Sequence, residues 1–249
     1  MPRVFMIIAG VVLAILIWLF YQNSVEQKQQ ADLQEYETVL EEKTGSILQQ
    51  AQDWSKPIQI DLEDDRLDGD YAVMAQFILG QMRDRAEARN QYLRDLKAAN
   101  WDRFLDIDRL AKDQAQDYKE TEAMLKRVHE IVDSYEQTIQ QRATQQLEQV
   151  KQLDIKNRYR QQLADNLKAN QQQDNAHAIF EIEKQSLAKA DQLFLVLKNN
   201  KWEKKNQTFM FYEDAPLKQF NKLYQEIVQL NQQMTQVDQQ ALKEAENKL

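Results

Sequence analysis

Carboxylate and guanidinium side chains are densest in a short stretch near the middle of the chain. It holds Asp102, Arg103, Asp106, Asp108 and Arg109. Paired carboxylates can serve as general acid and general base, as they do in glycosidases. The three-residue spacing from Arg103 to Asp106 and from Asp106 to Arg109 suits ion pairs on a helix surface. We therefore expect these side chains to line a solvated helix face.

A second group of carboxylates lies in the segment 61–70, which contains six Asp or Glu residues. An EF-hand calcium loop needs Asp or Asn at its third position and Glu at its twelfth. Counted from Asp64, these two positions hold Arg66 and Ala75, so the pattern fails. We predict a solvated loop and no metal site, and whether residues 61–70 bind a cation stays open.

The residue types exclude several kinds of catalytic and cofactor site. Because the chain has no Cys, thiol nucleophiles and thiolate metal sites are impossible. Its two histidines are His129 and His177, and nothing in their positions brings them together. Four glycines cannot supply a phosphate-binding loop, and neither a G-x-S-x-G nor an H-E-x-x-H motif occurs. We therefore expect no catalysis and no cofactor.

The best candidate for an interaction surface is the segment 201–212. Aromatic and β-branched residues flank a polar centre, which predicts a small β-hairpin with its turn near Asn206 and Gln207. Because an isolated hairpin is only marginally stable in water, one side of it must pack on helices. The candidate site residues are its four aromatic side chains, Trp202, Phe209, Phe211 and Tyr212. They either pack in the core, with Phe194 or Phe220 as neighbours, or form an exposed binding patch.

The remainder of the chain after Val25 has the composition of long helices. Four glycines and three prolines in 249 residues leave few positions for turns. Apolar residues recur at spacings of three, four and seven, which is typical of amphipathic helices. The predicted fold is all-α, an elongated antiparallel helical bundle that resembles a coiled coil, with the single β-hairpin near 201–212.

A few positions divide this helical pattern. Pro57 ends the first helix after the N-terminal region, and a break is expected at residues 100–102. A long apolar pattern then runs from Phe104 to Leu153. The polar stretch 170–175 is either a loop or part of a continuous helix.

Upstream of the helices, the run Val4–Tyr21 contains no charged residue. A helix of this length covers about 27 Å, which is close to the hydrocarbon thickness of a bilayer. Trp18 and Tyr21 lie at its downstream end, where aromatic rings favour the membrane interface. Since no pair of small residues follows that would suit cleavage, we expect a transmembrane signal anchor that remains on the protein.

The charges beside this run predict its orientation. Arg3 precedes it, and Lys28 is the only positive residue among the next twenty after it. Because positive residues tend to stay in the cytoplasm, we expect residues 1–3 there and the domain 22–249 on the other side. In a bacterium this corresponds to a single-pass inner-membrane protein with its large C-terminal domain in the periplasm.

These features favour a function in binding. The net charge of −8 argues against nucleic acid as a partner. We expect a membrane-anchored protein–protein interaction or scaffold module, which contacts the lipid bilayer through residues 4–21 and another envelope protein. Association with a second copy stays open, as do the identity of the partner and the pathway. Two alternatives are a periplasmic ligand- or stress-sensing helical bundle and a cell-wall-acting enzyme or its regulator.

Overall fold

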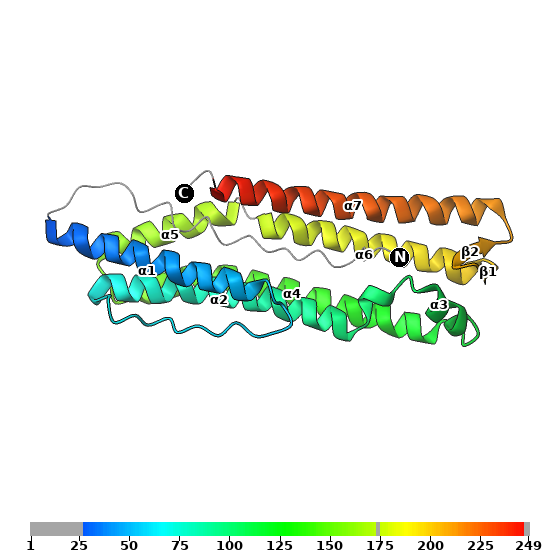
Figure 1. The fold of residues 1–249 in the computed structure, drawn as a ribbon, viewed down its shortest axis with the longest axis horizontal. Coiled ribbons are helices and arrows are strands. Elements are labelled where there is room, and N and C mark those ends of the chain that lie inside the picture. Colours follow the sequence, from blue (N-terminus) through cyan, green and yellow to red (C-terminus); the bar gives the residue numbers. More distant parts are fainter. Residues whose placement is uncertain (1–26, 173–174, 247–249) are drawn as a thin grey trace. The chain divides into compact units, whose positions relative to one another are not determined.

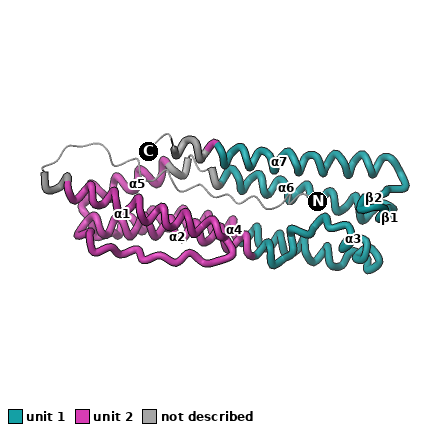
Figure 2. Tube along the Cα trace, viewed as in Figure 1, with its two compact units in different colours: residues 1–9, 95–134, 176–239 teal, residues 10–94, 135–175, 240–249 magenta. Residues whose placement is uncertain are grey.

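The computed structural model describes residues 27–172 and 175–246, so the predicted anchor 4–21 lies outside the described residues. Within these ranges seven α-helices and one two-stranded sheet are present (Figure 1), which confirms the predicted helical bundle with a single hairpin. None of the described helices is long and apolar enough to cross a membrane. The chain divides into two compact units, which Figure 2 draws in different colours.

Unit 2 consists mainly of residues 27–94 and 135–172. It contains α1 (Gln27–Ala51), most of α2 (Gly69–Ala98), the second half of α4 (Lys119–Gln152) and α5 (Asn157–Gln172). Each of these helices contributes apolar side chains to one core. The fully or almost fully buried ones include Tyr36, Ile47, Met74, Leu79, Val150 and Leu163.

α1 and α2 run in the same direction, which differs from the antiparallel arrangement predicted from the sequence. Tyr36 of α1 lies beside Tyr71 of α2, with ring centroids 5.2 Å apart. Further along both helices, the hydroxyl of Thr44 donates to the sulfur of Met82 at 3.7 Å. The physical reason is the connection 52–68, which runs back beside the two helices before α2 begins (Figure 1). Amphipathic spacing specifies the buried face of a helix but not the direction of its neighbour.

The connection 52–68 packs on the core and is not simply the solvated loop that we expected. Ile58 is buried, and its backbone N–H donates to a carboxylate oxygen of Glu87 at 2.8 Å. Further apolar side chains of the connection pack against the same core, namely Ile60, Leu62 and Leu67. The apolar residues of the connection therefore lie inward and most of its acidic residues are exposed, whereas the side chain of Asp64 is only 13% exposed.

α4 runs antiparallel to α2 in this unit, in agreement with the prediction. Tyr92 stacks on Tyr135 with ring centroids 4.4 Å apart. Gln81, which lies earlier in α2, donates to Gln149, which lies later in α4, at 2.9 Å. The short turn after α4 then reverses the chain into α5.

Unit 1 consists mainly of residues 95–134 and 176–239. It holds α3 (Ile107–Gln114), the first half of α4, α6 (Asn175–Asn199) and most of α7 (Asp214–Glu246). Lys198 pairs with Glu122 at 2.5 Å, and Asp191 pairs with His129 at 3.0 Å. Because the α6 residue numbers fall as the α4 numbers rise, these two helices are antiparallel.

The apolar pattern from Phe104 to Leu153 is divided between two helices. The expected break at 100–102 is present as a 3₁₀ turn, Trp101–Arg103, after Asn100 in the left-handed conformation. A second break, which we did not predict, separates α3 from α4 where Asp117 and Tyr118 both have φ of 58°. The apolar periodicity continues across it because α3 and the first half of α4 bury their apolar faces in unit 1, and the second half of α4 buries its face in unit 2.

The predicted hairpin is confirmed. It consists of β1 (Trp202–Lys205) and β2 (Thr208–Phe211), which pair antiparallel between α6 and α7 (Figure 1). Asn206 and Gln207 form the turn and have φ of 49° and 61°. Two positive φ values are typical of the type I′ turn, whose twist matches that of the strands. Asn tolerates this conformation better than most residues do, which explains the turn at this site.

Candidate functional site

The inner face of the hairpin belongs to the core of unit 1. Trp202 is 3% exposed and Phe209 is 7% exposed. Their rings lie 5.0 Å apart, and Phe209 lies 4.9 Å from Phe220 of α7, as predicted. Phe211 is half-buried and also contacts Phe220, at 5.6 Å. Three of the four candidate site residues therefore hold the hairpin on the helices, and the exposed aromatic patch reduces to Tyr212.

Trp202 is also fixed by buried hydrogen bonds. Its indole N–H donates to the hydroxyl oxygen of Tyr118 at 2.7 Å and lies 3.1 Å from the carbonyl of Leu197. The Tyr118 hydroxyl donates to the same carbonyl at 3.0 Å, and its ring meets Phe194 edge to face at 5.6 Å. Positive φ is strained for a bulky residue such as Tyr118, and these contacts hold it in place.

The tip of the hairpin is tied to α3. Lys204 and Gln207 both donate to the carboxylate of Asp108, the latter at 3.4 Å. These donors lower the pKa of Asp108, with the Lys204 ammonium as the largest cause. Gln114 donates from the end of α3 to the backbone carbonyl of Trp202 at 3.3 Å. The hairpin is therefore braced along its β1 side.

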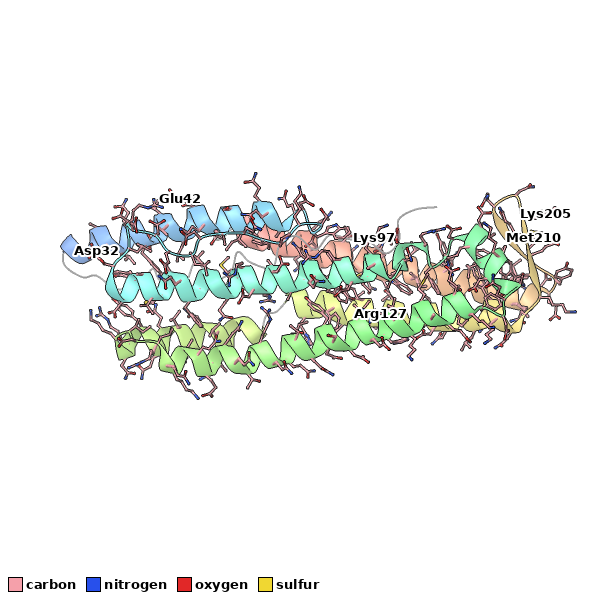
Figure 3. The ribbon with its side chains drawn as sticks, turned by 90° about the horizontal axis from the view of Figure 1, so that it is seen from below. Asp32, Glu42, Lys97, Arg127, Lys205 and Met210 are labelled. Carbon is pink, nitrogen blue, oxygen red and sulfur yellow. The ribbon has the colours of Figure 1, made fainter. Side chains whose placement is uncertain are left out.

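The outer face of the hairpin is exposed and carries both apolar and charged side chains. Tyr212 is 70% exposed and Met210 is 43% exposed, which places them among the most exposed large apolar residues in the described part of the chain. Glu203 and Lys205 lie on the same face, because side chains alternate along a strand and 203 pairs with 210. Figure 3 labels Met210 and Lys205 on this hairpin.

We call Glu203, Lys205, Met210 and Tyr212 the outer hairpin face. Its non-aromatic members were missed from the sequence, although the alternation of side chains along the two predicted strands was a signal that could have found them. The hydroxyl of Tyr212 reaches a carboxylate oxygen of Glu203 at 3.4 Å across the two strands. Tyrosine presents a rigid ring with a polar hydroxyl and methionine an adaptable apolar side chain, and both residue types are enriched at protein–protein interfaces.

The charged cluster at 102–109 has structural roles, and one of its members is not on a solvated face. Asp106 caps the N-terminus of α3 by accepting the backbone N–H of Asp108 and Arg109, and it pairs with Arg103 at 2.9 Å. Arg109 is only 5% exposed. Its guanidinium donates to the backbone carbonyls of Arg103 and Phe104, at 3.1 and 2.8 Å. The expectation of a solvated helix face is therefore wrong for Arg109, because its side chain is buried.

A buried polar network joins Arg109 to the start of α4. Its guanidinium donates to the hydroxyl of Thr121 at 2.9 Å, and that hydroxyl donates to Asp113 at 2.6 Å. The carboxylate of Asp113 also accepts the backbone N–H of Glu120 and Thr121, at 3.0 and 2.7 Å. Burial acts to raise the pKa of Asp113, but these hydrogen bonds outweigh it and the pKa is lowered. The network closes the α3–α4 turn beneath the hairpin.

In the acidic segment, basic residues bind the backbone and the carboxylate of Asp64. Lys43 donates to the backbone carbonyls of Asp61 and Glu63, at 2.9 and 2.6 Å, and pairs with Asp64 at 3.4 Å. Arg66 pairs with Asp64 at 2.8 Å and, above all other causes, holds the pKa of that carboxyl well below its usual range. Among the residues that the structure describes, no group of three or more His, Cys, Asp or Glu side chains is placed to hold a metal ion.

Comparison with known proteins gives no relative for this arrangement: no protein-family model, no curated protein and no solved structure matches the chain.

Proposed function

We propose that this chain is a non-catalytic, membrane-anchored interaction module of the bacterial envelope. In this proposal residues 4–21 span the inner membrane, residues 1–3 lie in the cytoplasm and the helical domain 22–249 lies in the periplasm. The anchor is supported by the uncharged run Val4–Tyr21 and by Arg3 in front of it. The domain binds another envelope protein, and the outer hairpin face is its docking surface.

One observation carries the docking surface: Tyr212 is 70% exposed on a hairpin whose opposite face is fixed in the core. A rigid aromatic side chain loses little conformational entropy when it is covered, which makes tyrosine favourable at interfaces. Met210 supplies an adaptable apolar neighbour on the same face. Because Trp202 and Phe209 anchor the hairpin, the surface is already ordered before a partner arrives.

The test is site-specific photo-crosslinking in cells that express the full chain. A photoreactive phenylalanine analogue replaces Tyr212, and the matched control carries it in place of Gln192, which is exposed on α6 of the same unit. We expect one discrete adduct from position 212 that is absent from position 192. Adducts that are identical at both positions, or none from position 212, would contradict this docking surface.

A further inference from the structure

We propose that β2 pairs antiparallel with β2 of a second copy of this chain, so that two hairpins form one four-stranded sheet. This inference rests on the proposed function, because it names a partner for the same hairpin. The observations behind it concern the backbone at the two hairpin edges, the charge of the two strands and the side chains that self-pairing would cover.

The backbone ladder determines which groups of β2 face outward. The N–H of Tyr212 donates to the carbonyl of Lys201 at 3.2 Å, so these two residues form a hydrogen-bonded pair. Such pairs alternate with non-hydrogen-bonded pairs in antiparallel strands. The N–H and C=O groups of Phe209 and Phe211 therefore point away from β1, toward the free edge of β2.

The two edges of the hairpin differ in what covers them. On the β1 side α3 lies alongside the strand, and Gln114 donates to the outward carbonyl of Trp202. On the β2 side, no other described residue donates to or accepts from the backbone of Phe209 or Phe211 at that edge. The open edge presents two N–H and two C=O groups to an added strand.

The open edge is also the uncharged one. Exposed edge strands usually carry charged residues, especially Lys, or Pro, because these discourage pairing with another chain. β1 has the sequence Trp-Glu-Lys-Lys, with three charged residues, whereas β2 has Thr-Phe-Met-Phe, with none. Two β2 strands can therefore approach each other without repulsion between like charges.

One symmetric register engages all four outward groups of each strand. In this register Phe209 of each copy faces Phe211 of the other, and every free N–H and C=O group of these two residues finds a partner. Met210 then faces Met210 of the second copy at a non-hydrogen-bonded position on the two-fold axis. Tyr212 comes opposite Thr208 of the second copy. Four backbone hydrogen bonds form, and the exposed Met210 side chains cover each other.

Cysteine cross-linking of the full chain tests this register, because the chain has no native Cys. At a non-hydrogen-bonded pair the two Cα atoms lie about 4.5 Å apart, which is within the range that a disulfide bridges. Under mild oxidation we expect Met210→Cys to give a covalent dimer, with a doubling of the 29.5 kDa mass. Thr208→Cys and Tyr212→Cys should each give no covalent dimer alone and should give one when the two variants are mixed.

A second measurement does not depend on disulfide chemistry. Met210→Lys places two ammonium groups against each other on the two-fold axis, so we expect loss of the dimer in mass photometry of the full chain. Gln192→Lys makes the same charge change on an exposed face of α6 and should leave the dimer intact. Circular dichroism verifies that both variants keep their helical content.

The outcomes separate this inference from the proposed function. If Met210→Cys cross-links no more than Thr208→Cys, or if all three cysteine variants cross-link equally, the pairing of β2 strands is wrong. The proposed function survives that result if the photoreactive group at position 212 still forms its adduct with a different protein. If that adduct is instead a second copy of this chain, the pairing of β2 strands is supported, and the proposal that this face binds a different envelope protein is contradicted.

Discussion

Arg109 and Asp113 lie one helical turn apart on α3 and are both buried, and the side chain of Thr121 links them by hydrogen bonds. The nearest guanidinium nitrogen lies 3.7 Å from the Asp113 carboxylate, which is too long for a hydrogen bond. The hydroxyl of Thr121 lies between them, 2.9 Å from the guanidinium and 2.6 Å from the carboxylate. The first residues of α4 thus complete an ion pair that α3 alone leaves open.

We expect Thr121→Val to destabilise the protein by about 1–3 kcal/mol, because it leaves buried groups of Arg109 and Asp113 with fewer hydrogen bonds. Urea unfolding followed by circular dichroism measures this loss. The control Thr121→Ser keeps the hydroxyl and should lose clearly less stability. Unchanged stability in Thr121→Val, which keeps the methyl group and the shape of the side chain, would show that the hydroxyl contributes no net stability.

The same network predicts a pH dependence of stability. The pKa of Asp113 is lower in the folded protein than in the unfolded chain, where it is about 3.9. A group with a lowered folded pKa stabilises the protein above its unfolded pKa, and this contribution disappears as the pH falls through the folded pKa. We therefore expect Asp113→Asn to be less stable at neutral pH and to lose less stability on acidification than the wild type. Parallel unfolding curves across pH for the two proteins would contradict this.

The hairpin gives a prediction with an internal control. Trp202 is buried and hydrogen-bonded, so Trp202→Ala should cost about 3–5 kcal/mol, as truncation of a large buried aromatic does. Tyr212→Ala, at an exposed position on the same hairpin, should change stability by less than about 0.5 kcal/mol. The melting temperatures of the two variants show which of these two residues belongs to the core and which to the surface. A large loss of stability in Tyr212→Ala would show that the Tyr212 side chain is part of the packing and not a free surface group.

Much of this fold could be predicted from the sequence, and the failures have specific causes. Aromatic residues around Asn206 and Gln207 indicated the hairpin, because strand alternation and turn chemistry are local properties. The break at Tyr118 was missed because its positive φ depends on distant contacts with Leu197 and Trp202. The burial of Arg109 was missed for a similar reason, since its main acceptors are backbone carbonyls and a threonine of the next helix.

Loss of the Lys43 ammonium should loosen the connection 52–68 without unfolding the bundle. Lys43→Met removes donors to the carbonyls of Asp61 and Glu63 and the ion pair with Asp64. We expect faster amide hydrogen exchange in residues 57–67 and little change in the helices. Lys56→Met, at an exposed position in the same connection, is the control and should leave exchange in residues 57–67 unchanged. Unchanged exchange in Lys43→Met would show that the apolar side chains alone hold the connection.

The predicted membrane topology is tested with reporters fused after Leu249. A reporter that is active only in the periplasm should be active, because Arg3 in front of the apolar run keeps the N-terminus in the cytoplasm. A reporter that is active only in the cytoplasm is the control and should be silent. Activity of the cytoplasmic reporter alone would reverse the orientation.

The division of the chain into units also constrains how the protein is made. Unit 2 begins at the N-terminal side of unit 1, is interrupted after Arg94 and resumes at Tyr135. During synthesis, the core that contains Tyr36 and Ile47 is therefore incomplete until Leu163 has been synthesised. The core of unit 1 is likewise incomplete until the residues of α7, which follow the hairpin, have been synthesised. No single cut of the polypeptide separates the two units, because residues 95–134 of unit 1 lie between the two main segments of unit 2.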